Sequence, residues 1–102
     1  MAVKKQMRMS PGEQAKIFAA LGDPLRVRFM ETLLGAGEQS GSKIADDLGI
    51  SLALFCHHSK ILQEAGLIEK RKAAQTSYYL AKQSVLDGVF TQLKAGIRRS
   101  SQ

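Results

Sequence analysis

One stretch of the sequence, residues 42–66, limits the possible folds more than any other. It predicts two helices joined by a tight turn, the first over Ser42–Leu48 and the second over about Leu52–Ala65. Gly49 follows the last apolar residue of the first helix, where a left-handed C-cap favours glycine. Ser51 then supplies a hydroxyl that can cap the second helix. A short helix, a glycine-containing turn and a longer helix are typical of a helix-turn-helix.

The second of these helices has two different faces. Residues on one side recur at helical spacing and are expected to pack on the first helix: Phe55, His58, Leu62 and Ala65, with Leu54 and Ile61. The other side carries Leu52, Ala53, Cys56, His57, Lys60 and Gln63. In DNA-binding helix-turn-helix proteins, the outward side of the second helix enters the major groove near its N-terminus. An ordinary surface helix of a small bundle would show the same pattern.

The composition fits one small basic domain. The chain has 102 residues, of which 44% are hydrophobic, and its formal net charge is +6. A basic balance favours an anionic partner, such as nucleic acid or a membrane surface. No apolar run is long enough to cross a bilayer, no secretory signal is evident, and a single cysteine fits a reducing compartment. We therefore expect a cytoplasmic protein without a membrane partner.

The N-terminal half predicts a basic arm followed by two helices. Residues 1–9 form a short arm that we expect to be flexible, with phosphate contacts as an open alternative. The domain proper is predicted over residues 10–99. Ser10, Pro11 and Glu13 have the order of a capping box with proline at the first helical position. Asp23 followed by Pro24 starts the next helix by the same logic, and residues 35–41 are predicted to form a loop.

After Gly66 the pattern changes to two short extended runs around Ala74-Gln75. The runs predict a β-hairpin directly after the second helix of the helix-turn-helix. The hairpin is basic, so it is a candidate wing that touches DNA phosphates through Arg71, Lys72 and Gln75. Alternatively, the hairpin only covers the core and its charges are solvated.

The last segment, about residues 83–98, predicts a helix with a strong apolar stripe. A small domain has difficulty burying such a stripe at one end of its chain. We therefore expect a homodimer whose interface combines this helix with the first one: Ile17, Phe18, Leu21, Leu86, Val89, Phe90, Leu93 and Ile97. A two-fold dimer would present two recognition helices to DNA about one helical turn apart.

Three stretches of the sequence resemble the ArsR/SmtB family of winged-helix bacterial repressors. They are IFAALGDPLRVRFMETLL at 17–34, IADDLGIS with HHSKILQEAGLI within 44–68, and SYYL at 77–80. The resemblance implies a mainly α winged helix-turn-helix with the order α-α-α-α-β-β-α. It also implies a cytoplasmic homodimer that represses transcription and leaves its double-stranded DNA operator when an effector binds.

The metal sites of that family do not carry over to this sequence. Where the resemblance places a Cys-x-Cys pair before the turn, this chain has Ser40 and Ser42, and Lys43 replaces the following aspartate. Serine hydroxyls are poor ligands for soft metals, and a lysine puts a cation where the metal would sit. The last helix offers Asp87 but no histidine. We therefore predict no metal site and no cofactor.

Cys56-His57-His58 is the unusual cluster of the sequence. Three consecutive helical residues point about 100° apart and cannot converge on one ion, so a metal site here is not expected. His58 is predicted to be a hydrogen-bonded core histidine. Cys56 is either a small groove-facing residue or a sensor thiol, because its place near a helix N-terminus and beside His57 favours the thiolate. An oxidant or an electrophile such as a quinone would then be the effector.

Together these features predict a DNA-binding transcriptional regulator and not an enzyme, since no catalytic triad, carboxylate pair or phosphate loop stands out. The predicted groove contacts are Ser51, Leu52, Ala53, Cys56, His57 and Lys60. Two alternatives stay open. One is a metal-responsive repressor with atypical ligands, and the other is a winged-helix protein-interaction module that does not bind DNA.

Overall fold

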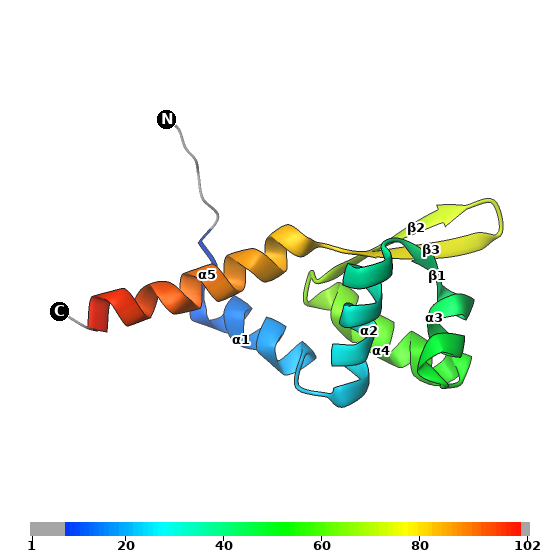
Figure 1. Ribbon diagram of the computed structural model, residues 1–102, viewed down its shortest axis with the longest axis horizontal. Coiled ribbons are helices and arrows are strands. Elements are labelled where there is room, and N and C mark those ends of the chain that lie inside the picture. The colour runs from blue at the N-terminus through cyan, green and yellow to red at the C-terminus, as the bar shows by residue number, and fades with distance from the viewer. Residues whose placement is uncertain (1–7, 101–102) are drawn as a thin grey trace.

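The computed structural model describes the backbone of residues 8–100 and the side chains of residues 8–97. It contains five helices and three strands within that range, shown in Figure 1. In chain order they are α1 (Pro11–Ala20), α2 (Pro24–Ala36), β1 (Gln39–Ser40), α3 (Gly41–Leu48), α4 (Leu52–Glu64), β2 (Ile68–Ala73), β3 (Thr76–Ala81) and α5 (Gln83–Ser100). The predicted mainly α fold with a hairpin after the helix-turn-helix is confirmed.

Side-chain caps set the starts of four helices. The Ser10 hydroxyl accepts from the Glu13 amide at 3.1 Å, and the Glu13 carboxylate accepts from the Ser10 amide at 2.8 Å, which confirms the capping box. Asp23 caps α2 and Ser51 caps α4, as predicted. The α3 helix begins at Gly41, one residue earlier than expected, because the Ser40 hydroxyl accepts from the Lys43 amide and acts as its cap.

The sheet has one strand more than the sequence suggested. Its order is β1-β3-β2, and all pairs are antiparallel. Residues 35–41 were expected to be a loop, but Gln39 and Ser40 pair with Tyr79 and Tyr78 of β3. A two-residue strand is too short to show any alternation, so the local sequence gives no sign of it.

An aromatic cluster forms the centre of the core. Phe55 of α4 stacks on Phe29 of α2, with ring centroids 5.4 Å apart, and meets Tyr79 of β3 edge-on at 5.2 Å. Helices α2 and α4 and the sheet are therefore joined through one side chain in the first half of α4. Aromatic pairs of this kind stabilise a core beyond their buried area.

Three large apolar residues are partly exposed, among them Leu54, which the sequence placed on the packed face of α4. Leu54 is 37% exposed because it lies about 100° around the helix from Phe55, which makes the core contact of that turn. Val27 and Leu34 are 38% and 40% exposed and lie at the edge of the buried face of α2. Ser59, which the apolar pattern did not include, is buried on α4 and its hydroxyl donates to the Cys56 carbonyl at 3.2 Å.

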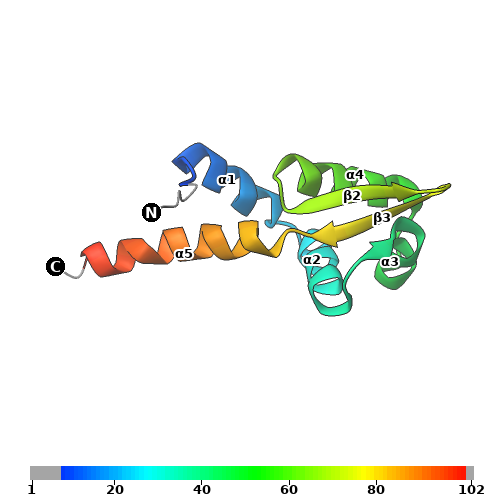
Figure 2. The same cartoon turned by 90° about the horizontal axis from the view of Figure 1, so that it is seen from above.

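The molecule is elongated, with principal extents of 51 × 30 × 23 Å. Figures 1 and 2 show α5 projecting away from the sheet and from α3, with α1 on the same side of the molecule. The β2–β3 hairpin points toward the opposite end, beside α3. None of the helices within residues 8–100 is both long and apolar enough to span a bilayer.

Candidate nucleic-acid interface

The outward face of α4 is exposed on the surface of the protomer. Leu52 is 61% exposed, and Ala53, Cys56, His57 and Lys60 are also exposed. These five predicted groove residues therefore lie on one side of the helix, whereas Gln63 is half-buried. Ser51, the sixth predicted contact, accepts from the Leu54 amide through its hydroxyl at 3.1 Å and is the cap of the helix.

The opposite face of α4 is fixed by a polar link as well as by Phe55 and Leu62. Arg26 of α2 donates through Nε to the Ala20 carbonyl at the end of α1, at 2.6 Å. Its Nη1 lies 3.0 Å from Nδ1 of His58. The prediction of a hydrogen-bonded core histidine is confirmed, and its partner, 32 residues away, is a residue that the sequence patterns did not single out.

Electrostatics around this link favour an uncharged His58. Burial lowers the pKa of His58, and the nearby Arg26 and His57 lower it further, whereas Asp23 acts in the opposite direction. Burial would raise the pKa of the Asp23 carboxyl, but hydrogen bonds from the Arg26 and Leu25 amides outweigh it and the pKa is lowered. The α1–α2 corner and α4 therefore share one small polar network.

One of the three predicted DNA contacts of the wing, Arg71, is bound to another residue of the same protomer. Arg71 donates through Nε and Nη2 to the Glu38 carboxylate, at 2.8 and 3.0 Å, and its guanidinium lies 5.2 Å from the Tyr78 ring centroid. The hydrogen bond from Arg71 lowers the pKa of Glu38. Arg71 is thus bound to Glu38 within the protomer, whereas Lys72 and Gln75 are exposed. Sequence reasoning missed Glu38, since nothing local links it to the hairpin.

Cys56 is a free thiol on the exposed face of α4. Its neighbour His57 is exposed, and the His57 and His58 rings meet edge-on with centroids 5.3 Å apart. Beneath the helix, burial raises the pKa of Tyr79, and Cys56 adds to this effect. Within residues 8–97, no three His, Cys, Asp or Glu side chains come together in a way that could hold a metal ion.

The apolar stripe of α5 divides between the core and the surface. Val89 is 0% exposed and Ile17 is 3% exposed, so these two predicted interface residues are part of the core of the protomer. Phe90, Leu93 and Ile97 are 43%, 55% and 67% exposed. Phe18 and Phe90 meet edge-on with centroids 5.8 Å apart, which joins α1 to α5. Leu21 and Leu86 are half-buried.

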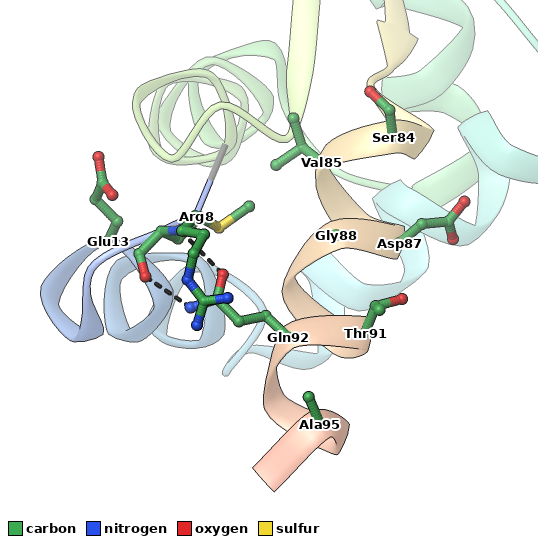
Figure 3. Close-up of a pocket in the computed structure, with 10 residues that line it drawn as sticks. Arg8, Glu13, Ser84, Val85, Asp87, Gly88, Thr91, Gln92 and Ala95 are labelled. Atoms are coloured by element: carbon green, nitrogen blue, oxygen red, sulfur yellow. Dashed lines mark hydrogen bonds between the residues drawn. The ribbon is translucent and has the colours of Figure 1, made fainter. Parts of the chain in front are cut away.

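A shallow pocket of about 920 Å³ lies between the start of α1 and the first half of α5 (Figure 3). The Gln92 side chain accepts from the Met9 amide at 2.9 Å and donates to the Met9 carbonyl at 2.7 Å, closing one side. Most of the predicted flexible arm, residues 1–7, lies outside the described residues. The pocket is lined by Arg8, Met9, Glu13, Ser84, Val85, Asp87, Gly88, Thr91, Gln92 and Ala95.

No protein-family model matches the chain, but individual proteins do. The uncharacterized HTH-type transcriptional regulator MJ1325 of Methanocaldococcus jannaschii is 35% identical over 65 residues, which are 64% of this chain and 73% of that protein. A homolog of the cadmium resistance transcriptional regulatory protein CadC from Staphylococcus aureus is 32% identical over 78 residues, 76% of this chain and 64% of that protein.

Solved structures show the same likeness. A homodimeric winged helix-turn-helix DNA-binding domain from Mycobacterium bovis has a TM-score of 0.69 at 21% identity, covering 87% of this chain and 80% of that one, and supports the fold alone. An ArsR-like transcriptional regulator from Rhodococcus sp. RHA1 has a TM-score of 0.81 at 30% identity, covering 88% and 84% of the two chains. The resemblance found in the sequence is confirmed, and the chain belongs to the ArsR family of winged helix-turn-helix transcriptional regulators.

Proposed function

We propose that this regulator is a cytoplasmic homodimeric repressor that binds a two-fold DNA operator through α4 and the β2–β3 wing. Residues 10–99 would form a single domain for both DNA binding and dimerisation. One observation carries the proposal: the groove residues predicted from the sequence share one exposed face of a helix whose other face is buried in the core. A recognition helix needs this combination, because base contacts require a fixed side-chain position.

Each exposed residue of α4 has a contact that its chemistry favours. Leu52 and Ala53 offer only apolar contact, which suits thymine methyl groups in the major groove. His57 can reach a phosphate or a base edge, and Lys60 can neutralise a phosphate. In the wing, Lys72 and Gln75 are exposed for backbone contact, whereas Arg71 would first have to exchange Glu38 for a phosphate.

Dimerisation is supported by the apolar surface of α5. Phe90 and Leu93 are large hydrophobic residues on a helix that projects from the body of the molecule, and burying them would offset the cost of association. The similar Mycobacterium bovis domain is homodimeric. A two-fold dimer would set two α4 helices about 34 Å apart, the spacing of successive major grooves on one side of a duplex.

The test of DNA binding uses Lys60→Ala with Lys94→Ala as a matched control on α5. Fluorescence anisotropy against duplexes from the region upstream of the protein's own gene would be measured at several salt concentrations. We expect Lys60→Ala to weaken binding and to lower the salt slope by about two per dimer, because one lysine–phosphate pair is removed in each subunit. The control removes the same charge and should leave the slope unchanged. Equal slopes for the two variants would contradict the assignment of Lys60.

For the effector, we propose that the Cys56 thiol adds to an electrophile such as a quinone. The sulfur forms a bond to a ring carbon as a ring C=C bond is lost, and one quinone oxygen takes up the thiol proton. The hydrogen of the attacked carbon then moves to the other oxygen, which gives a substituted hydroquinone, so no outside oxidant is needed. The exposure of the thiol on the groove face supports this, because an adduct there would collide with DNA. A peroxide that oxidises the same sulfur to a sulfenate is the related alternative.

Cys56→Ser separates the thiol from other sensors. If the proposal holds, benzoquinone releases the wild-type protein from DNA and leaves the serine variant bound. Release of both would exclude the thiol. The similarity to a CadC homolog favours a metal-responsive repressor as the second candidate function. Titration of the purified protein with Zn²⁺ and Cd²⁺ would detect the metal binding that this function requires.

A further inference from the structure

We propose that Arg26 is a positioning residue for the recognition helix, and that DNA binding requires the His58 it contacts to be neutral, which makes the regulator sensitive to acid. The inference rests on the proposed function of α4 as the recognition helix. It concerns the buried face of that helix and not the residues that would touch DNA.

The geometry decides which atom donates. A guanidinium has only N–H donors and no acceptor, and it stays protonated at any physiological pH. His58 Nδ1, 3.0 Å from Arg26 Nη1, must therefore be an unprotonated acceptor. The contact exists only for the neutral imidazole that carries its proton on Nε2.

Arg26 is itself held in place at two other points. Its Nε donates to the Ala20 carbonyl at 2.6 Å, and its backbone amide donates to the Asp23 carboxylate at 3.2 Å. The Nε hydrogen bond would therefore oppose a movement of the guanidinium toward a displaced imidazole. The Arg26 side chain thus connects the α1–α2 corner to the middle of α4.

Protonation of His58 would turn this contact into a repulsion. Two cations would face each other where His58 is only 4% exposed and Arg26 is half-buried, so water would screen their repulsion incompletely. Asp23 is the nearby carboxylate that favours the charged form, while Arg26 and His57 disfavour it. Asp23 uses its Oδ1 to accept from both backbone amides of α2, and no hydrogen bond joins its carboxylate to His58 within the described residues.

The consequence for DNA follows from the rigidity of α4. His58 lies between Cys56 and Lys60 in sequence but on the opposite, buried side of the helix. A shift of the imidazole away from Arg26 would tilt or roll the helix and displace the groove residues together. A misplacement of about 1 Å in such a site is enough to weaken its function strongly.

The sign of the expected effect is distinctive. Acidification normally strengthens DNA binding, because protonated side chains near the interface attract phosphates. The chain has two histidines, His57 and His58, so the assignment is simple. We expect affinity to be constant near neutral pH and to fall as the pH approaches and passes the pKa of His58, which is lower than the usual 6.5, by up to about tenfold per pH unit for each subunit.

The experiment compares wild type, His58→Asn and His58→Leu by fluorescence anisotropy from pH 7.5 to 5.0 at constant ionic strength. Asparagine carries its Oδ1 on Cγ, where imidazole carries Nδ1, and it accepts without titrating. The asparagine variant should bind at pH 7.5 and lose the acid-induced weakening. The leucine variant lacks the acceptor and should bind weakly at every pH. His57→Asn is the matched control and should keep the weakening.

An NMR measurement on the wild type tests the contact without any variant or DNA. The ¹⁵N shifts of His58 at pH 7.5 should show the Nε2–H tautomer with Nδ1 as acceptor. An Nδ1–H tautomer, or an asparagine variant that weakens with acid as the wild type does, would overturn the proposal. A wild type that binds none of the duplexes at any pH would instead contradict the proposed function, while the tautomer would still decide on the contact.

Discussion

Substitution of Gly41, the first residue of α3, by alanine adds one methyl group and tests the packing on the buried side of α4, the proposed recognition helix. A Cβ added there would lie 3.0 Å from Cε2 and 3.1 Å from Cζ of Phe55, and 3.1 Å from Cε1 of Tyr79. Neither ring can easily move away, since Phe55 stacks on Phe29 and meets Tyr79 edge-on. Gly41→Ala therefore forces a methyl group into a filled space.

Two effects of opposite sign set the magnitude. Replacing glycine by alanine in a helix stabilises it by up to about 1 kcal/mol. Overpacking a well-filled core costs about 1–3 kcal/mol. We expect the packing effect to win, so that Gly41→Ala lowers the free energy of unfolding by about 1–2 kcal/mol. The midpoint of thermal unfolding should fall by about 4–8 °C for each kcal/mol in a domain of this size.

Gly35 near the end of α2 is the matched control. A Cβ there would meet no heavy atom within 4 Å, so Gly35→Ala keeps the helical gain and has no packing cost. Urea unfolding followed by circular dichroism, at equal protomer concentrations, would compare the two variants with the wild type. We expect opposite signs. If Gly41→Ala is as stable as Gly35→Ala, then the space between Phe55 and Tyr79 is not filled as described, and the reasoning fails.

Three other perturbations test the surface and the charges. Glu38→Gln should raise DNA affinity, by up to about fivefold, and steepen its salt dependence, because Arg71 is then released for a phosphate; the same substitution in an Arg71→Ala background should have no effect. Leu93→Lys should halve the mass measured by sedimentation, since a cation would enter the proposed apolar interface, and an unchanged mass would exclude Leu93 from it. The free energy of unfolding should fall as the pH drops below about 6.5, because folding lowers the pKa of His58 and the unfolded chain therefore binds the proton first. It should fall again below about pH 4, because folding also lowers the pKa of Asp23. His58→Asn should remove the first of these two steps only, and a first step that persists in this variant would exclude His58 as its source.

The sequence predicted those features whose cause is local. Ser10, Asp23 and Ser51 cap helices through residues two or three positions away, so a short pattern contains the whole interaction. The exposed face of α4 followed in the same way from helical spacing. Helical spacing could not say which residues of an apolar stripe turn inward and which outward, so Val89 was assigned to a partner when it belongs to the core.

The two polar links of the site were beyond such reasoning. Arg26 and His58 are 32 residues apart, and Glu38 and Arg71 are 33 apart, with nothing in either local sequence to indicate the other. Their side chains meet only because the helices and strands have already packed. A single sequence shows charged residues on solvated faces, and long-range pairing depends on the completed fold.

The position of α4, the proposed recognition helix, depends on the corner between α1 and α2 as well as on its own hydrophobic face. Arg26 donates to the carbonyl of Ala20, the last residue of α1, and the same guanidinium contacts the His58 imidazole. Because α1 also contacts α5 through Phe18 and Phe90, a change in how two α5 helices meet in the proposed dimer would have a short physical route to α4. In the proposed repressor, an effector would not need to touch the predicted DNA contacts to change affinity. A small rotation at the α1–α5 contact, transmitted through Arg26, would alter the spacing of the two α4 helices in that proposed dimer.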